Sequence, residues 1–286
     1  MRIMVTGGTG TVGSQVAQDL LARGVEVYVL SRSGTRIPSG AKLVQGDLRE
    51  PATVRSALSG MDGLFLLTAI GMTETHEGLM AVNGATDARV KRIAYLSVQN
   101  LEQVPGMPHC GAKIPVEMAI KASGIPFTIL RANNFFQNDF WNMDALLQHG
   151  VYPSPIGDVG LSRVDIRDIA EAACLALVED AGRNETIDLV GPDVITAQSA
   201  AAEWGRALAR DVRYGGDDLD AFEQRTLRYL PAVTVYDLRF MYDFFQRCGL
   251  RASGEAVARL TTILGRPPRS FASFVQETAA AWTAAA

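Results

Sequence analysis

The sequence predicts an α/β fold, a doubly wound parallel sheet followed by a smaller, helix-rich C-terminal lobe. Short apolar runs of strand length alternate with helical patterns up to about residue 130. A glycine-rich turn joins the first apolar run to the first helical pattern, and beyond residue 196 the patterns are mostly helical. Alternation of this kind favours parallel strands, because each crossover between parallel neighbours needs room for a helix.

The first strand–turn–helix unit organises the prediction. Residues 2–6 are a short apolar run that contains β-branched side chains, and residues 7–13 follow at once with glycines spaced G-x-x-G-x-x-G. A helical pattern then starts at Val12, with apolar side chains one turn apart, and a second apolar run covers residues 26–30. This order is typical of the βαβ unit that binds dinucleotides.

The glycine turn is expected to hold a diphosphate. The first N–H groups of a helix lack partners within the helix, and with the helix dipole they favour an anion by about 0.3–1 kcal/mol at an exposed site. Glycine allows the backbone to turn sharply and to approach the phosphates closely. The expected cofactor contacts are Gly7, Thr9, Gly10, Thr11, Val12 and Gly13. An ordinary tight turn is the alternative.

The remaining elements are expected as follows. Strands are expected at 42–47, 64–68, 92–97, 126–130 and 185–190, and helices from residue 50 and over 76–89, 111–123 and 168–179. Asp168 and Glu171 have the spacing of a capping box at the start of the last of these helices. Further helices are expected over 196–209, 217–230, 234–247, 253–264 and 270–282. The predicted domains are residues 1–150, with 160–190 returning to the sheet, and the helix-rich lobe 191–286.

The end of the second strand indicates the choice of cofactor. A site that prefers NAD usually carries an acid there, but this strand ends Leu-Ser-Arg, with Ser31 and Arg32. A guanidinium can hold a 2′-phosphate through charge-assisted hydrogen bonds, which favours NADP over NAD, with Arg36 as a second contact. The alternative is that Arg32 is a solvated surface side chain, and NAD then stays possible.

Side chains at the ends of the third and fourth strands are expected along the same cofactor. Asp47 could accept from the adenine amino group, with Leu48 beside it, or it could cap the turn before Pro51. Leu67 and Thr68 end the fourth strand and would line the path toward the nicotinamide, or they belong to the core.

With these residues in place, the chain resembles the NmrA-like family of atypical short-chain dehydrogenase/reductases. The likeness is carried by VTGGTGTVG, VQGDL, KIPVEMAIKASGIPFTILRANNFFQN and RVDIRDIAEAA, and by LGRPPRSFASFVQE near the end of the chain. The resemblance implies a Rossmann fold that binds NAD(P). The family includes reductases of quinones, triphenylmethane dyes and phenylpropanoids, and also regulators that bind the cofactor without turning it over.

The resemblance also suggests catalytic residues. Typical short-chain dehydrogenases carry Tyr-x-x-x-Lys, and the corresponding stretch here runs from His109 to Lys113, so the lysine is kept and the tyrosine is lost. By resemblance, Lys113 holds the nicotinamide ribose or donates a proton. His109 is a second candidate proton donor, since imidazole titrates near neutrality, or it is part of a helix-entry loop. Ser97 is expected near the nicotinamide, or it caps the end of its strand.

The segment after the sixth strand is the expected substrate loop. It contains Asn133, Asn134, Phe135 and Phe136. Two aromatic rings among amides suit a cleft that stacks a flat molecule and fixes its polar edge. The alternative is that both phenylalanines join the two lobes by packing.

Composition excludes several other classes. Lys+Arg 27 against Asp+Glu 31 gives a net charge of −4, and no basic stretch indicates a nucleic-acid surface. The three cysteines form no CxxC pair, which favours a reducing cytoplasm. No apolar run reaches the ~18 residues of a membrane helix. The histidines have no partners at metal-ligand spacing, and no G-x-S-x-G occurs, so neither a metal site nor a nucleophile elbow is expected.

Three functions are compatible with these observations. The first is an NADPH-dependent reductase of a flat hydrophobic carbonyl or quinone, a small aromatic molecule. The second is another reaction on the same fold, such as a pathway-specific oxidation, oxygenation or isomerisation. The third is an NAD(P)-sensing regulator, which the missing tyrosine suggests. The sequence does not specify the natural substrate or the oligomeric state.

Overall fold

The computed structural model describes residues 1–284 and divides into two compact units. The first unit comprises residues 1–132, 166–189 and 259–266, and the second comprises 133–165, 190–258 and 267–286. The division differs from the expected one mainly in placing residues 133–150 with the second unit. No helix among residues 1–284 combines the length and hydropathy that crossing a membrane requires.

A seven-stranded parallel sheet forms the centre of the first unit within the described residues, which confirms the expected α/β class. Its strands are β1 (Arg2–Val5), β2 (Glu26–Ser31), β3 (Lys42–Gln45), β4 (Gly63–Leu66), β5 (Arg92–Val98), β6 (Phe127–Ala132) and β8 (Glu185–Leu189), in the order β3-β2-β1-β4-β5-β6-β8. The chain reverses direction across the sheet between β1 and β4, which are paired neighbours. A crevice at the carboxyl ends of such a strand pair is where ligands bind in open α/β sheets.

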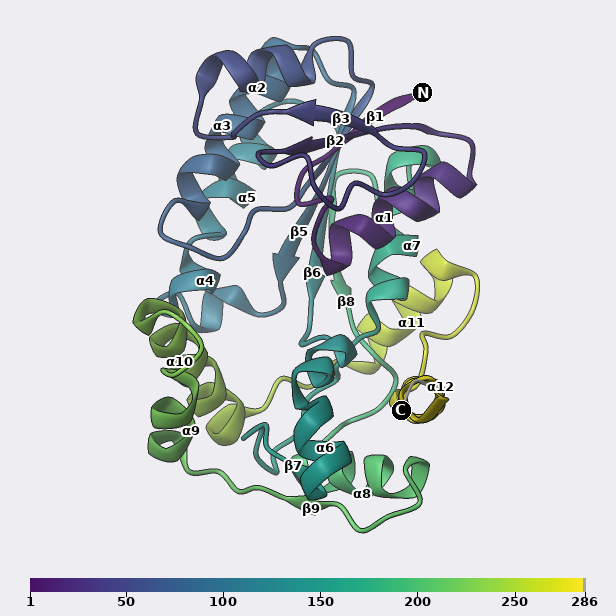
Figure 1. Cartoon of the computed structure of the whole chain (residues 1–286). Coiled ribbons are helices and arrows are strands. Elements are labelled where there is room, and N and C mark those ends of the chain that lie inside the picture. The colour runs from purple at the N-terminus through teal and green to yellow at the C-terminus, as the bar shows by residue number, and fades with distance from the viewer. Residues whose placement is uncertain (285–286) are drawn as a thin grey trace. The chain divides into compact units, whose positions relative to one another are not determined.

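Helices cover both faces of this sheet (Figure 1). They are α1 (Thr11–Ala22), α2 (Pro51–Leu58), α3 (Glu74–Asp87), α4 (Pro108–Gly111), α5 (Ile114–Ala122) and α7 (Ile166–Val178), with the short 3-10 helix η1 (Leu101–Gln103). Helices α1 and α7 pack together on one face, and α2, α3 and α5 pack on the other. Apolar side chains from α2, α3 and α5 and from the strands form a continuous buried core, because a sheet covered on both faces leaves little of its strands to solvent.

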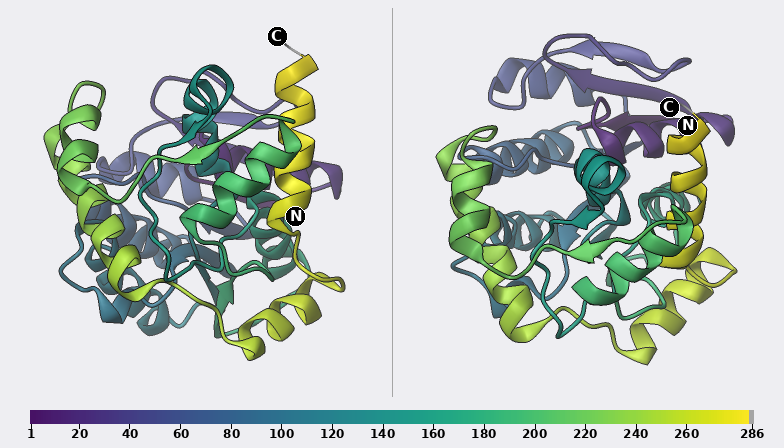
Figure 2. Two further views of the ribbon diagram at one scale, coloured as in Figure 1. Left: turned by 90° about the horizontal axis from the view of Figure 1, so that it is seen from below. Right: turned by 60° about the horizontal axis from the view of Figure 1, so that its bottom comes forward.

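The second unit is mostly helical. It contains η2 (Phe136–Asn142), α6 (Met143–His149), α8 (Ala197–Ala207), α9 (Leu219–Thr226), α10 (Ala232–Cys248) and α12 (Phe271–Ala284), together with the two-stranded parallel ribbon of β7 (Val151–Tyr152) and β9 (Arg213–Tyr214). Helix α12 runs alongside α8 (Figure 2), where the Trp204 and Trp282 rings stack 4.8 Å apart. Helix α11 (Gly254–Leu264) leads from the second unit back into the first.

Two helix starts differ from the sequence expectation. The helix expected over 111–123 is two helices, α4 and α5, with Ala112 and Lys113 between them. Helix α7 begins at Ile166, so Asp168 lies in its first turn instead of capping it from outside. The Asp168 carboxylate binds the Arg266 guanidinium at 2.8 Å, an ion-pair role that the capping-box spacing does not reveal.

Candidate functional site

The glycine turn after β1 is built by close backbone contacts. Thr6 Oγ1 donates to the Leu67 carbonyl at 2.9 Å and accepts from the Leu67 N–H at 2.8 Å, which ties the end of β1 to the end of β4. Gly7 has a φ of 66°, which favours glycine. A Cβ on Gly13 would lie 2.3 Å from the Gly7 carbonyl oxygen, so only glycine allows α1 to start this close to the turn.

The N-terminus of α1 is open to an anion. Gly10 is the N-cap residue, and among residues 1–284 no side chain caps it. The first turn contains no acidic residue, while Gly10 and Thr11 are exposed, Thr9 is half-buried and Val12 points into the core. The N–H groups and the helix dipole are therefore free to act on a negatively charged ligand.

Three arginines follow the carboxyl ends of β2 and β3 in the chain. Arg32 and Arg36 are exposed in the loop after β2, and the buried Ser31 Oγ accepts from the Gly34 N–H at 3.2 Å. Asp47 binds Arg49, with Arg49 Nε 3.0 Å from Oδ1 and the guanidinium NH2 2.5 Å from Oδ2. The sequence reasoning missed Arg49, although its position two residues after Asp47 in a turn suggests the pairing.

The Asp47 carboxylate is committed to this pair. Its hydrogen bonds from Arg49, aided by the charge of Arg32, lower its pKa to about 2. The expected hydrogen bond from adenine would have to share an oxygen with the Arg49 guanidinium. Leu48 is half-buried and packs on the core of the first unit.

Lys113 belongs to a buried polar cluster, together with Glu74, Thr68 and Tyr95. Its ammonium forms an ion pair with Glu74, whose side chain is 1% exposed, against 6% for Lys113. Thr68 Oγ1 donates to the same Glu74 oxygen at 3.2 Å. Lys113 Nζ also lies 5.9 Å from the centre of the Tyr95 ring. The sequence reasoning identified Lys113 and Thr68 but missed Glu74, which lies 39 positions before Lys113.

Two atoms of this cluster lack partners. Among residues 1–284, neither Glu74 Oε2 nor the Tyr95 hydroxyl has a hydrogen bond, although both are buried. Burial, with the charges of Glu74 and Glu117, raises the pKa of the Tyr95 phenol. A buried polar atom without a partner costs about 1–3 kcal/mol, so these two atoms are candidate contacts for a ligand hydroxyl.

The break between α4 and α5 separates the two candidate proton donors. His109 lies in α4 and is buried. The Lys113 N–H donates to the Cys110 carbonyl at 3.1 Å, and Thr75 Oγ1 donates to the Ala112 carbonyl at 2.8 Å. His109 and Lys113 therefore do not share one continuous helix, although α4 begins before Gly111.

The Ser97 hydroxyl is hydrogen-bonded to a charged side chain, Glu117. Its Oγ donates to Glu117 Oε1 at 2.6 Å, and Arg131 Nε donates to the same oxygen at 2.9 Å. Ser97 is 2% exposed. In this arrangement its hydroxyl fixes the Glu117 carboxylate within the first unit.

The segment expected to contact substrate, residues 133–136, belongs to the second unit and contains both buried and accessible side chains. Asn133 Nδ2 donates to the Leu250 carbonyl at 2.7 Å, and its Oδ1 accepts from the Asn134 N–H at 2.7 Å. Phe136 is fully buried, with the rings of Phe271 and Phe274 5.2 and 5.4 Å away. These contacts place Asn133 and Phe136 in packing roles, and leave Asn134 and Phe135, which are half-buried, as the accessible members of the loop.

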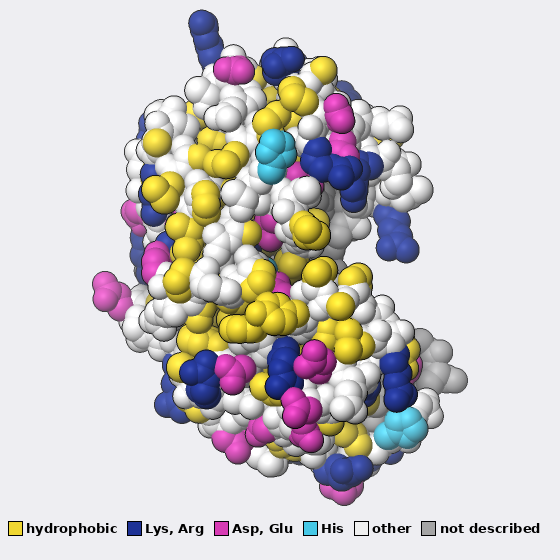
Figure 3. Space-filling model, turned by 90° about the vertical axis from the view of Figure 1, so that its left-hand side faces the viewer, with side chains coloured by type: hydrophobic (Ala, Val, Ile, Leu, Met, Phe, Trp, Pro, Cys, Tyr) yellow, Lys and Arg dark blue, Asp and Glu magenta, His cyan; other side chains and the backbone are white. Residues whose placement is uncertain are grey.

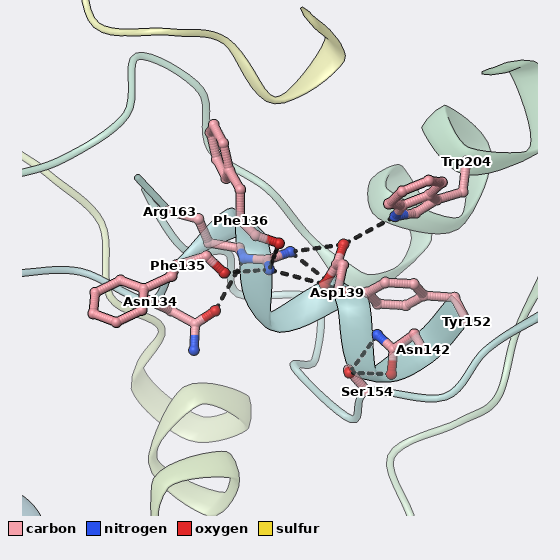
Figure 4. Close-up of polar contacts among 9 residues, drawn as sticks. All are labelled: Asn134, Phe135, Phe136, Asp139, Asn142, Tyr152, Ser154, Arg163 and Trp204. Carbon is pink, nitrogen blue, oxygen red and sulfur yellow. Dashed lines mark hydrogen bonds and ion pairs between the residues drawn. The ribbon is translucent and has the colours of Figure 1, made fainter. Parts of the chain in front are cut away.

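A buried ion pair between Arg163 and Asp139 contacts this loop (Figure 4). Their side chains are each 1% exposed and lie 2.8 Å apart. Asp139 also accepts from the Tyr152 hydroxyl at 3.0 Å and from Trp204 Nε1 at 2.9 Å. Burial raises the pKa of the Tyr152 phenol well above its usual value, and the Asp139 charge acts in the same direction. The network was not identified from the sequence, because its members come from four separate segments.

Apolar side chains are exposed along α10 of the same unit. Val233, Tyr236 and Phe240 are 60%, 54% and 43% exposed, and the last two rings lie 5.0 Å apart. Hydrophobic side chains gather on the face of the molecule shown in Figure 3.

Among residues 1–284, no three His, Cys, Asp or Glu side chains lie close enough together to bind a metal ion.

Comparison with known proteins gives a family. The NmrA-like family model matches residues 1–261, and the chain therefore belongs to the NmrA-like family. The NAD(P)H azoreductase of Xenophilus azovorans is 29% identical over 290 residues, which cover 99% of this chain and all of that protein. A (4-alkanoyl-5-oxo-2,5-dihydrofuran-3-yl)methyl phosphate reductase of Streptomyces griseus is 31% identical, covering 98% of this chain and 99% of that protein.

A solved structure supports the fold. The NADPH-dependent quinone oxidoreductase QOR2 of Escherichia coli, crystallised with NADPH, superposes with a TM-score of 0.84. It is 24% identical, and the match covers 97% of this chain and 99% of that one.

Proposed function

We propose that this protein is an NADPH-dependent reductase of a flat, hydrophobic acceptor such as a quinone or an azo dye. The observation that carries the proposal is the glycine turn between β1 and α1, which ends in an uncapped helix N-terminus without acidic residues. A relative matched over its full length and named NAD(P)H azoreductase supports it. The nicotinamide cofactor, when bound, supplies the hydride.

The residues of the first unit fit such a cofactor. Gly7, Thr9, Gly10, Thr11, Val12 and Gly13 would hold the diphosphate, and Gly13 is a position that a Cβ would fill. Ser31 and Arg32 would hold the ribose 2′-phosphate, with Arg36 supplying further positive charge. Asp47, Leu48, Leu67, Thr68 and Ser97 lie at or just after the carboxyl ends of strands that a dinucleotide follows in this fold.

Lys113 is proposed to contact the cofactor or to donate a proton. By family resemblance it holds the nicotinamide ribose, and the orphaned Glu74 Oε2 and Tyr95 hydroxyl add two polar atoms to the same cluster. Either the Lys113 ammonium or the His109 imidazole supplies the proton that the reduced oxygen or nitrogen takes up. Asn134 and Phe135 contact the substrate, while Asn133 and Phe136 keep their loop in shape.

The direct test is anaerobic NADPH oxidation with three acceptors: menadione, methyl red and malachite green. We expect loss of nicotinamide absorbance with at least one acceptor at a rate well above the protein-free blank, and slower oxidation of NADH. Rates equal to the blank with all three acceptors would contradict the proposal. If NADPH still binds in that case, the sensing function becomes the better account.

A further inference from the structure

The side-chain amide of Asn134 has a fixed orientation. Arg163 Nε lies 3.0 Å from one end of this amide. A guanidinium can only donate, so the amide atom that faces it must be the oxygen, Oδ1. The amide nitrogen, Nδ2, therefore points away from Arg163, as Figure 4 shows.

Hydrogen bonds hold the backbone around Asn134 in place. The Asn134 carbonyl accepts from the Val164 N–H at 2.9 Å, and its own N–H donates to Asn133 Oδ1 at 2.7 Å. The Arg163 guanidinium also donates to the Phe135 carbonyl at 2.7 Å. Arg163 is held in turn by Asp139. Turning the Asn134 amide over would lose the bond from Arg163 and place two donors against each other, because a guanidinium cannot accept.

Asn134 Nδ2 is left as a donor for a ligand. No residue among those the structure describes accepts a hydrogen bond from it, and Asn134 is half-buried instead of enclosed. The neighbouring Phe135 is half-buried too, and it takes part in none of the close ring pairs among residues 1–284. Both residues follow β6 directly, at a carboxyl end of the sheet where this fold binds ligands.

We propose that Asn134 selects the substrate by its acceptor atom. Its two Nδ2 hydrogens donate to a carbonyl oxygen or an azo nitrogen beside the Phe135 ring, while Arg163 keeps the amide oxygen out of reach. The site therefore favours molecules that present a lone pair here and disfavours those that present only an N–H. This inference rests on the proposed reductase function and adds the polarity of the substrate contact.

The variant Asn134→Asp tests the proposal with almost no change of shape. One carboxylate oxygen keeps the bond from Arg163, and the other replaces the donor with a charged acceptor that repels a carbonyl oxygen. We expect kcat/KM for menadione to fall by about tenfold or more, mainly through KM, with unchanged NADPH affinity and Tm. The control Asn138→Asp, an exposed position in the same segment, adds the same charge and should stay within about twofold of the wild type.

Equal kcat/KM values for the two variants would overturn the inference, as would a loss of Tm or NADPH affinity that accounts for the whole effect. If the wild type turns over none of the acceptors, the reductase proposal fails separately. The donor is then tested by NMR, using the Asn134 NH2 resonances that disappear in Asn134→Asp. We expect menadione to shift these resonances and to leave those of Asn138 in place. Unmoved Asn134 resonances would overturn the inference.

Discussion

At the scale of single residues, the ion pair of Asp47 with Arg49 makes part of the folding stability depend on pH. Arg49 and Arg32 lower its pKa from 3.8 to about 2 in the folded state. The folded protein therefore holds this carboxylate charged at pH values where the unfolded chain would protonate it. Its contribution to stability is present above about pH 4 and is lost as the pH falls toward 2.

We predict that Asp47→Asn flattens this part of the pH dependence. The free energy of unfolding, measured by urea titration at pH 5 and pH 3, should fall less between the two values in the variant than in the wild type. Identical slopes would contradict the assigned pKa. Other carboxylates with lowered pKa values, such as Asp62, contribute equally to both proteins and cancel in the comparison.

The buried Glu74–Lys113 pair gives a second prediction at this scale. Glu74→Gln leaves the Lys113 ammonium buried without a counter-charge, so we expect a loss of about 3–5 kcal/mol in the free energy of unfolding. Lys113→Met should cost a similar amount, and the double variant clearly less than the sum. A chemical-denaturation cycle over the four proteins measures the coupling, and additive losses would show that the two side chains do not interact.

Individual polar residues were harder to assign from the sequence than the elements that carry them. Lys113 and Thr68 were expected at the site, but Glu74, which binds both, stands in a helix that has no family motif. Ser97 was expected near the nicotinamide or as a cap of its strand, and the bond of its hydroxyl to Glu117 belonged to neither expectation. These partners lie far apart along the chain, and a pattern of local periodicity contains no information about such pairs.

At the scale of elements, the β1–turn–α1 unit is the part of the fold that depends most on glycine. We predict that Gly13→Ala weakens NADPH binding by about tenfold or more, at least about 1.4 kcal/mol, because the new methyl group would displace the turn or α1. Gly106→Ala is the matched control, since nothing lies within 4 Å of its Cβ position. Titration by NADPH fluorescence measures both, and equal affinities would contradict the role of the turn.

Most elements of the first unit could be predicted because apolar runs and helical periodicity mark them directly. The α4–α5 break has a local signal that the expected helix over 111–123 did not take into account. Pro115 stands in the first turn of α5, because a proline lacks an N–H and its ring clashes with the carbonyl four residues earlier. A Cβ on Gly111 would lie 2.3 Å from the Pro105 carbonyl oxygen, so α4 packs on the preceding loop. Helix α7 begins two residues earlier than expected, and the ion pair of Asp168 with Arg266, almost a hundred positions later, is not visible in the local pattern.

In the second unit, too, local sequence patterns predict the helices but not the contacts between distant segments. The positions of its helices follow from periodicity, but the loop that they support depends on Arg163, Asp139 and Trp204, which meet only after folding. Phe136 could have been either a substrate contact or core, and its contacts with Phe271 and Phe274 place it in the core.

At the scale of the whole molecule, this NmrA-like chain folds into two compact units, and the glycine turn that we propose for the cofactor lies in the first of them. The order of the parallel strands, the glycine turn and the exposed arginines after β2 are parts of one arrangement for a phosphorylated dinucleotide. The proposed contact with the acceptor depends on the Asn134 amide and the Phe135 ring. Cofactor binding is the step on which all other assignments depend.

Calorimetric titration of the wild type and of Arg32→Ala with NADPH and NADH tests that step most directly. We predict one binding site per chain, tighter binding of NADPH than of NADH by the wild type, and loss of this preference in Arg32→Ala through weaker NADPH binding alone. Absence of binding heat and of any thermal stabilisation with both nucleotides would contradict the account.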